Sequence, residues 1–370
     1  MRVRANVEGL KAAVAAVSSV VPTKSPNPIL TSILLEAKEG ETTVTGNDLE
    51  VALVYTVAGV EVQEPGAVVM PPKKLLEFLN LTTDPDVTIE TADTHVVIRS
   101  SRGCSRLPSE DDGLFPRAAA FDAKNYQICD GQHLRIAIDR TVFAADPTST
   151  RYALAGVQFE VDGESVKLVA TDGRRLALQP IDGVKSHGEI EPSKQVVPIK
   201  GLKAALKILD NSGCHFYFTK NSFHLRTERA TLYARLVEGR FPPWGDVVPL
   251  QKDRTFEAIA KSSELLQSVK QAGITTSEES RGVEFKFHPS GKCELISKSE
   301  GGNSSVEMSY EHVSGNPIEI AFAQHYLVSG IAQMDENSDV RIHLQNEKGA
   351  ALFEGDNEYQ YVVMPLTKEA

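Results

Sequence analysis

The chain has 370 residues, of which 41% are hydrophobic and 24% are charged, and its formal net charge is −11. This length predicts two or three domains, and the composition excludes a fibrous or disordered chain. No apolar run approaches the ~18 residues that span a bilayer, so we expect no membrane segment. The acidic total argues against nucleic-acid binding unless Lys and Arg gather locally, because phosphates need cations.

The first 21 residues fit two alternatives. Two arginines followed by an apolar stretch over residues 12–21 resemble a secretory signal. However, the large apolar side chains recur at the spacing of one helix face. They are Val7, Leu10, Val14, Val17 and Val21. We therefore predict an amphipathic helix over 8–21, with a signal peptide as the alternative.

The rest of the chain alternates between predicted helices and strands in a repeated order. Helical periodicity predicts further helices over 72–82, 131–145, 200–210, 259–271 and 323–334. The segments between them show β-branched alternation and turn signals such as Glu39-Gly40 and Asp162-Gly163. This order predicts an α+β fold with antiparallel sheets and with the helices gathered on one side.

Three similar stretches recur along the chain. They begin at Ile33, Val157 and Val283, so the spacings are 124 and 126 residues. A period this long is a whole domain rather than a short solenoid repeat. We therefore predict three like domains over 1–122, 128–248 and 254–370, with linkers near 122–128 and 248–254. Three such domains in a row suggest a curved or closed assembly.

The four cysteines, Cys104, Cys129, Cys214 and Cys293, are widely spaced and form no Cys-x-x-Cys or Cys/His cluster. This pattern argues against a disulfide framework and against a zinc site. It favours reduced thiols in a cytoplasmic protein. We expect no metal and no cofactor.

Charge is unevenly distributed between helices and the rest of the chain. The predicted helices hold ten basic residues, namely Lys11, Lys73, Lys74, Arg135, Arg140, Lys200, Lys203, Lys207, Lys261 and Lys270. They hold five acidic ones, namely Glu8, Glu77, Asp139, Asp210 and Glu264. For a single helix, a solvated polar face is the simpler interpretation. Across three repeats, a shared basic surface becomes credible, and such a surface would attract phosphates without reading sequence.

Three motifs, in their order along the chain, carry a family resemblance. They are Ala170-Thr171-Asp172-Gly173-Arg174-Arg175-Leu176-Ala177, Leu236-Val237-Glu238-Gly239-Arg240-Phe241-Pro242 and Tyr361-Val362-Val363-Met364-Pro365-Leu366, with Pro28-Ile29-Leu30 and Arg281-Gly282-Val283 in support. Over its whole length the chain resembles the bacterial sliding clamps, the beta subunits of the replicative DNA polymerase. The resemblance implies a homodimer closed head to tail into a ring of six domains, with helices inside and antiparallel sheets outside. Such a ring encircles double-stranded DNA and tethers the polymerase, and closure rather than affinity keeps it on the DNA.

The resemblance also implies residue roles. A pocket between the second and third domains binds short linear peptides of the DNA polymerase, the clamp loader and repair proteins. The matching positions are Arg151, Leu154, Thr171, Gly173, Arg174, Arg175, Leu176, Pro242, Val247, Val362, Met364, Pro365 and Leu366. Of these, Arg151 and Arg175 are expected to hold peptide carbonyls or carboxylates. Arg174 departs from the family, which often has His there. The acidic Pro243-Trp244-Gly245-Asp246 replaces a segment that is often basic, and Trp244 is either a groove wall or a packed corner.

DNA contacts and the ring interface follow from the same resemblance. Lys24 and Tyr152 are expected near the ring face, with Arg135, Lys200, Lys203 and Lys207 on the helices behind them. Tyr152 would stack on a base of single-stranded template, or else be a half-buried aromatic beside the pocket. The ring interface is expected at about 102–108 and 265–275, with Arg102, Cys104, Ile274 and Thr275. These side chains are less apolar than a tight obligate interface prefers, so we predict a comparatively weak dimer.

Two other functions compete with this interpretation. In an enzyme, Asp172 would act as a base and the neighbouring arginines would bind phosphate, but Asp172-Gly173 is more simply a tight turn between strands. The sequence has no His-Glu-x-x-His, no P-loop and no nucleophile elbow, so we expect no catalytic site. A peptide-binding scaffold that does not bind DNA remains the alternative, and the basic helices argue against it.

Overall fold

The computed structural model describes residues 1–370 apart from 93, 123, 150–151, 277–281 and 367–370, and apart from the side chains of Tyr152 and Asp253. Its residues divide into two compact units. Unit 1 comprises Met1–Arg135, Gly183–Glu191 and Val197–Leu236, and unit 2 comprises Ile136–Asp182, Pro192–Val196 and Val237–Ala370. In the part of the chain that is described, no helix is both long and apolar enough to cross a membrane.

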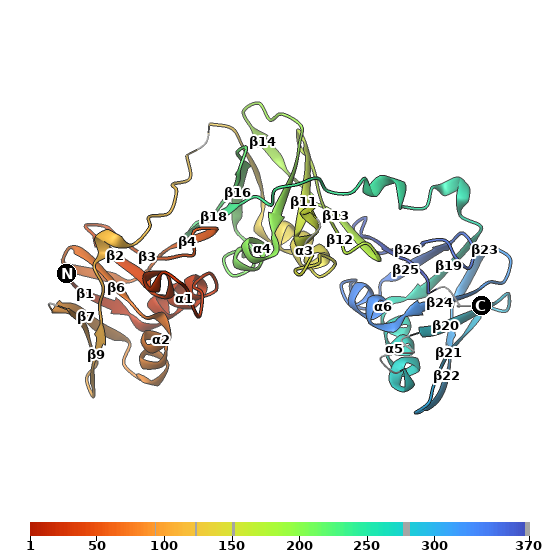
Figure 1. Cartoon of the computed structure of the whole chain (residues 1–370), viewed down its shortest axis with the longest axis horizontal. Coiled ribbons are helices and arrows are strands. Elements are labelled where there is room, and N and C mark those ends of the chain that lie inside the picture. Colours follow the sequence, from red (N-terminus) through yellow and green to blue (C-terminus); the bar gives the residue numbers. More distant parts are fainter. Residues whose placement is uncertain (93, 123, 150–151, 277–281, 367–370) are drawn as a thin grey trace. The chain divides into compact units, whose positions relative to one another are not determined.

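Unit 1 is built on two antiparallel sheets (Figure 1). The five-stranded sheet has the order β5 (Val60–Glu64), β1 (Arg2–Asn6), β7 (Asp86–Ala92), β8 (His95–Arg99) and β9 (Cys104–Pro108). The larger sheet has the order β14 (Lys185–His187), β10 (Tyr126–Asp130), β16 (Gly213–Phe218), β17 (Ser222–Arg226), β18 (Ala230–Arg235), β4 (Val51–Thr56), β3 (Glu41–Asn47), β2 (Ile33–Lys38) and β6 (Gly66–Met70). Its helices are α1 (Val7–Ser18), α2 (Pro72–Leu81), α4 (Ile199–Ala205) and the first residues of α3 (Gly131–Val142).

Unit 2 holds the other two sheets. The larger has the order β15 (Ser193–Pro198), β11 (Gly156–Asp162), β12 (Ser165–Thr171), β13 (Arg175–Pro180), β27 (Gln360–Val363), β26 (Ala351–Glu354), β25 (Asp339–Leu344), β19 (Phe256–Lys261) and β23 (Glu311–Gly315). The smaller has the order β22 (Gly302–Ser309), β21 (Lys292–Ser299), β20 (Gly282–His288) and β24 (Glu319–Ala323). Helix α5 (Ser262–Ala272) packs against α6 (Gln324–Ile331) and against β21 and β22.

The repeated order of elements and the α+β class are confirmed. Each predicted helix is present, although most are shorter than predicted. The one predicted over 259–271 begins three residues late, because Phe256–Lys261 forms strand β19. Phe256, Ala258 and Ala260 are buried and alternate with less buried neighbours, which is the two-residue period of a strand. Similar strands, β1 and β10, precede α1 and α3 and were not predicted.

Helix α1 shows how the local sequence fixes an element. The side chain of Asn6 accepts a hydrogen bond from the Gly9 N–H at 3.0 Å and so caps the first turn. Leu10, Val14 and Val17 are buried, as the apolar periodicity predicted. The helix ends at Ser18, so Val21 lies beyond it.

Both large sheets run across the predicted domain boundaries. In unit 1, β18 pairs with β4, and Leu232 lies opposite Leu53. In unit 2, β13 pairs with β27, and Leu176 lies opposite Val362. The middle third of the chain therefore contributes strands to both units, and the three domain boundaries stay a prediction.

Candidate functional site

The turn between β12 and β13 is held by its own side chains. The Asp172 carboxylate accepts the backbone N–H groups of Arg174 and Arg175, both at 3.0 Å. The Thr171 hydroxyl donates to the Arg175 carbonyl at 2.6 Å and accepts from the Gly173 N–H at 3.0 Å. Gly173 has φ +85°, a conformation that side chains rarely adopt. Asp172 is therefore a turn residue, as its sequence context indicated.

Arg175 is fixed by contacts inside unit 2. Its Nε donates to Asp172 Oδ2 at 2.9 Å, and its Nη1 and Nη2 donate to Ser329 Oγ at 2.5 Å and to the Phe143 carbonyl at 2.8 Å. The guanidinium also lies 5.3 Å from the Phe143 ring centroid and 4.9 Å from that of Tyr326. These three hydrogen bonds and two ring contacts fix the orientation of the guanidinium at the site.

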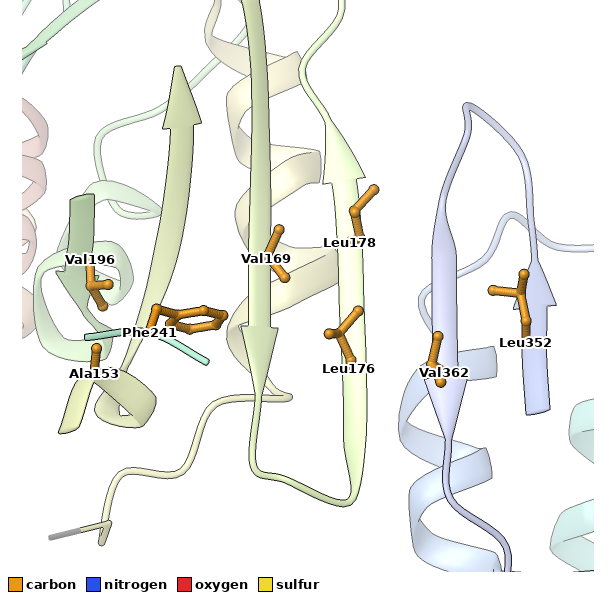
Figure 2. Packing of buried hydrophobic residues seen from close by; sticks show 8 residues of the cluster. All are labelled: Ala153, Val169, Leu176, Leu178, Val196, Phe241, Leu352 and Val362. Atoms are coloured by element: carbon orange, nitrogen blue, oxygen red, sulfur yellow. The ribbon is translucent and has the colours of Figure 1, made fainter. Parts of the chain in front are cut away.

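A buried apolar cluster forms the base of the site (Figure 2). It consists of Ala153, Val169, Leu176, Leu178, Val196, Phe241, Leu352 and Val362. Figure 2 shows Leu176 and Val362 on the two adjacent strands β13 and β27. The pairing continues past β27, because the Met364 N–H donates to the Arg174 carbonyl at 2.9 Å. Met364 is thereby held beside the β12–β13 turn.

The remaining wall comes from the segment around helix η4 (Trp244–Asp246). Trp244 packs against the apolar cluster, and its Nε1–H donates to Glu160 Oε1 at 2.8 Å. Lys167 Nζ lies 4.6 Å from the centroid of the same ring. Trp244 therefore packs against the core and also forms a wall of the site. The sequence had left open which of these two roles it has.

These elements enclose a largely apolar pocket of about 210 Å³, called the apolar pocket below. It is lined by Thr171, Gly173, Arg174, Arg175, Leu176, Pro242, Trp244, Val247, Val362 and Met364. Nine of these ten are residues for which the family resemblance implied a peptide-binding role. The structure brings them together inside unit 2.

Of the other four predicted pocket residues, the three that the structure describes do not line it. Leu154 lies in helix η3 (Tyr152–Ala155), where its carbonyl accepts the Asp146 N–H at 2.9 Å. Pro365 follows Met364, and Leu366 lines a separate cavity of about 150 Å³. Arg151 lies outside the described residues, as do Arg281 of the supporting motif and the last four residues of the chain.

The predicted DNA-contacting cations fall into two groups. Lys24, Lys203 and Lys207 are exposed. Lys200 forms an ion pair with Asp48, and Arg135 donates to the carbonyls of Leu206 and Leu209, at 2.9 and 3.1 Å. The side chain of Tyr152 lies outside what the structure describes.

Arg140 does not belong to a basic surface, contrary to the prediction from helix charge. Its side chain is 4% exposed and forms ion pairs with Asp356 and with Asp335, the latter at 3.1 Å. Lys261 also differs from the prediction, because it ends strand β19 rather than lying in a helix, and its Nζ lies 2.6 Å from Asp339. The basic character of the helices is therefore smaller than the sequence count indicated.

The predicted interface residues lie at two places. Arg102 and Cys104 are exposed, the latter at the start of β9, which is an edge strand in unit 1. Ile274 is exposed in helix η6 (Gly273–Thr275) of unit 2. The Thr275 hydroxyl already forms hydrogen bonds within unit 2, since it lies 2.6 Å from Ser297 Oγ and 3.1 Å from Ser304 Oγ.

Across the described residues, no three His, Cys, Asp or Glu side chains gather as metal ligands would.

Comparisons with known proteins match nearly the whole chain. Models of the DNA polymerase III beta subunit match residues 1–113 as its N-terminal domain, 129–243 as its central domain and 247–367 as its C-terminal domain. The chain is 29% identical over 360 residues to the beta sliding clamp of Pseudomonas aeruginosa, with 95% of each protein covered.

Solved structures show the same similarity. A DnaN sliding clamp of Pseudomonas aeruginosa bound to griselimycin matches with a TM-score of 0.90 and 25% identity, covering 99% of each chain. The DNA polymerase sliding clamp of Bacillus subtilis matches in fold with a TM-score of 0.92 and 22% identity, covering 100% of each chain.

Proposed function

We propose that this chain, which belongs to the bacterial DNA polymerase III beta-subunit family of sliding clamps, recruits its partner proteins through the apolar pocket of unit 2. The chain is a DNA sliding clamp. The observation that carries the proposal is the convergence of Leu176, Pro242, Val247, Val362 and Met364 on one pocket of about 210 Å³. A site of this kind suits the apolar side chains of a short linear peptide.

The pocket suits many partners rather than one. Val247 and Met364 are exposed, whereas Leu176 and Val362 are buried. The unbranched Met side chain adapts to guests of different shape. We propose that the partners are the DNA polymerase, the clamp loader and repair proteins, each docking through a short peptide. In this role the chain is an accessory subunit without a catalytic site of its own.

We further propose that two copies close into a ring of six domains around duplex DNA, in the bacterial cytoplasm. Edge strands β9 and β22 support this, because each presents unpaired backbone groups that a second copy would complete. The exposed Lys24, Lys203 and Lys207 would contact phosphates without reading sequence. Salt screens such contacts, so the ring can slide.

The chain provides a matched pair of variants that tests the peptide site. Val247 in the apolar pocket and Val313 on β23 are both 43% exposed. A fluorescent peptide with a Leu-Phe anchor is titrated with the protein and followed by polarisation. Val247→Ser should weaken binding about fivefold, since burying the rest of one Val side chain contributes about 1 kcal/mol. Val313→Ser should leave affinity unchanged. Equal affinity of Val247→Ser and the unaltered chain would reject the pocket.

The ring is tested on DNA topology. A closed ring stays on circular DNA and leaves when that DNA is linearised, whereas a peptide-binding scaffold that does not bind DNA shows no such dependence. Retention that is the same before and after linearisation would contradict closure around the duplex.

A further inference from the structure

A second, polar cavity lies beside the apolar pocket in unit 2. It has a volume of about 650 Å³, and its wall includes Pro242 and Trp244, which also line the apolar pocket. Its charged lining residues are Glu160, Lys167, Lys194, Arg240 and Asp246. The two cavities therefore share a wall formed by Pro242 and Trp244.

Glu160 contacts three other side chains that line this polar cavity. Its carboxylate accepts hydrogen bonds from Lys194 at 2.8 Å and from Trp244 Nε1 at 2.8 Å, and it lies 3.1 Å from Lys167 Nζ. Burial alone would raise the pKa of Glu160, but the hydrogen bonds from Lys194, Trp244 and Lys167 lower it below the usual value. Glu160 therefore stays ionised at neutral pH, and its acceptor capacity is used within the fold.

Cationic groups remain available after these bonds are made. Lys167 and Lys194 share the single carboxylate of Glu160, and the Lys194 side chain is still 67% exposed. Arg240 is exposed and forms no ion pair with any residue that the structure describes. Asp246 on the rim is the anion that offsets part of this charge. The cavity lining holds three cations and two anions, so it favours an anionic guest.

We propose that the polar cavity is an accessory subsite that takes a carboxylate side chain from the segment flanking the apolar anchor of the same partner peptide. An extended peptide advances about 3.3 Å per residue, so a chain anchored in the apolar pocket passes the wall of Pro242 and Trp244 within a few residues. Lys194 and Arg240 bind the carboxylate at the mouth of the cavity. The inference rests on the proposed peptide site and adds the charge that this site selects.

Trp244 provides the readout, because it is the only tryptophan of the chain and it lines both cavities. Its fluorescence is titrated with three synthetic peptides that share a Leu-Phe anchor and carry flanking Glu-Glu, Gln-Gln or Lys-Lys pairs. Each pair is placed before the anchor in one series and after it in another. In one of the series, the Glu-Glu peptide should bind about fivefold more tightly than the Gln-Gln peptide at low salt. This advantage should shrink at about 0.5 M salt.

Substitutions separate the subsite from the general charge of the protein. The double variant Lys194→Gln, Arg240→Gln should abolish the preference for Glu-Glu and leave the affinity for Gln-Gln unchanged. Lys220→Gln, which removes an exposed lysine of unit 1, is the matched control and should keep the preference. Asp246→Asn should strengthen binding of the Glu-Glu peptide, because it removes the anion on the rim.

The outcomes distinguish the two proposals. Equal affinity for Glu-Glu and Gln-Gln in both series, or preference for Lys-Lys, overturns the accessory subsite while the apolar pocket stands. A preference for Glu-Glu that survives the double variant also overturns it. Failure of all three peptides to bind overturns the peptide site itself, and the accessory subsite with it.

Discussion

Replacing Arg140 with Met should destabilise unit 2 without weakening the binding of DNA. Arg140 Nε donates to the Gln333 carbonyl at 3.0 Å, and its Nη1 donates to Gln179 Oε1 at 3.1 Å. Its Nη2 pairs with Asp335 and Asp356. The side chain thus joins α3 to the turn after α6 and to the β26–β27 turn. Met retains the apolar volume and removes every one of these donors.

The expected loss in free energy of unfolding follows from the carboxylates that Arg140→Met leaves unpaired. Removing one partner of a buried ion pair costs about 3–5 kcal/mol. Asp335 is 68% exposed and can regain water, so the lower end of that range applies, about 3 kcal/mol. For a unit of this size, such a loss lowers the unfolding midpoint by about 6–12 °C. Burial raises the pKa of Asp356, but the hydrogen bond and the charge of Arg140, together with hydrogen bonds from Asp335, lower it below the usual value. Without Arg140, that pKa should rise.

Unfolding is followed by the fluorescence of Trp244, which lies in unit 2 and is the single tryptophan. Lys203→Met on the exposed face of α4 is the control, and its free energy of unfolding should change by less than about 0.5 kcal/mol. Binding of duplex DNA is then measured against salt at a temperature where both variants are folded. Lys203→Met should weaken it, whereas Arg140→Met should not. A stable Arg140→Met variant with impaired DNA binding would refute the structural role of Arg140.

Three further predictions concern packing, pH and thiol reactivity. A Cβ at Gly330 would lie 2.1 Å from the Tyr361 ring, so Gly330→Ala should lower the free energy of unfolding by about 1–3 kcal/mol in urea titrations. The hydrogen bond from His343 lowers the pKa of Glu354 in the folded protein, so the ionised carboxylate stabilises the fold above pH about 5. This stabilisation is lost as the pH falls through the lowered pKa. Glu354→Gln should therefore make the free energy of unfolding less dependent on pH in the acid range, and an unchanged pH dependence would contradict the prediction. Cys104 is the exposed thiol of the four, so it should react first with a thiol reagent, and more slowly at protein concentrations where the proposed dimer forms.

Elements governed by local periodicity could be predicted from the sequence. The buried face of α1, which includes Leu10 and Val14, could be predicted because a helix repeats every 3.6 residues. The glycine after Asp172 identified a turn for a similar local reason. The pocket residues were implied by family resemblance rather than by such periodicity. Nothing in the local sequence places Leu176 opposite Val362, a partner far along the chain.

Charge was predicted less well, because the state of a charged side chain depends on distant partners. Arg140 counted as a surface cation, yet its partners Asp335 and Asp356 lie 195 and 216 residues away. Trp244 could not be assigned from its neighbours, because the acceptor that orients it, Glu160, is 84 residues earlier. A count of charges along helices therefore gives an upper limit for a basic surface.

The same turn occurs in both units, and comparing the two copies shows what makes a site. Asp48 Oδ1 accepts the N–H groups of Glu50 and Val51 as Asp172 Oδ1 accepts those of its own turn, and Leu49 at φ 76° occupies the place of Gly173. The turn is therefore a feature of the repeat and not of the function.

The difference lies in the residues around the turn. In unit 2, Leu176 faces Val362, whereas at the equivalent place in unit 1, Ala52 faces Tyr233. Phe241-Pro242 in unit 2 recurs as Phe115-Pro116 in unit 1. Unit 2 continues with Pro243-Trp244, whereas unit 1 continues with Arg117-Ala118, and the Arg117 guanidinium pairs with Glu36 at 3.0 Å. An ion-paired arginine followed by alanine offers a peptide less apolar surface than a proline followed by a tryptophan packed on a core. The pocket in unit 2 therefore depends on apolar residues placed around a turn that the repeat already supplied.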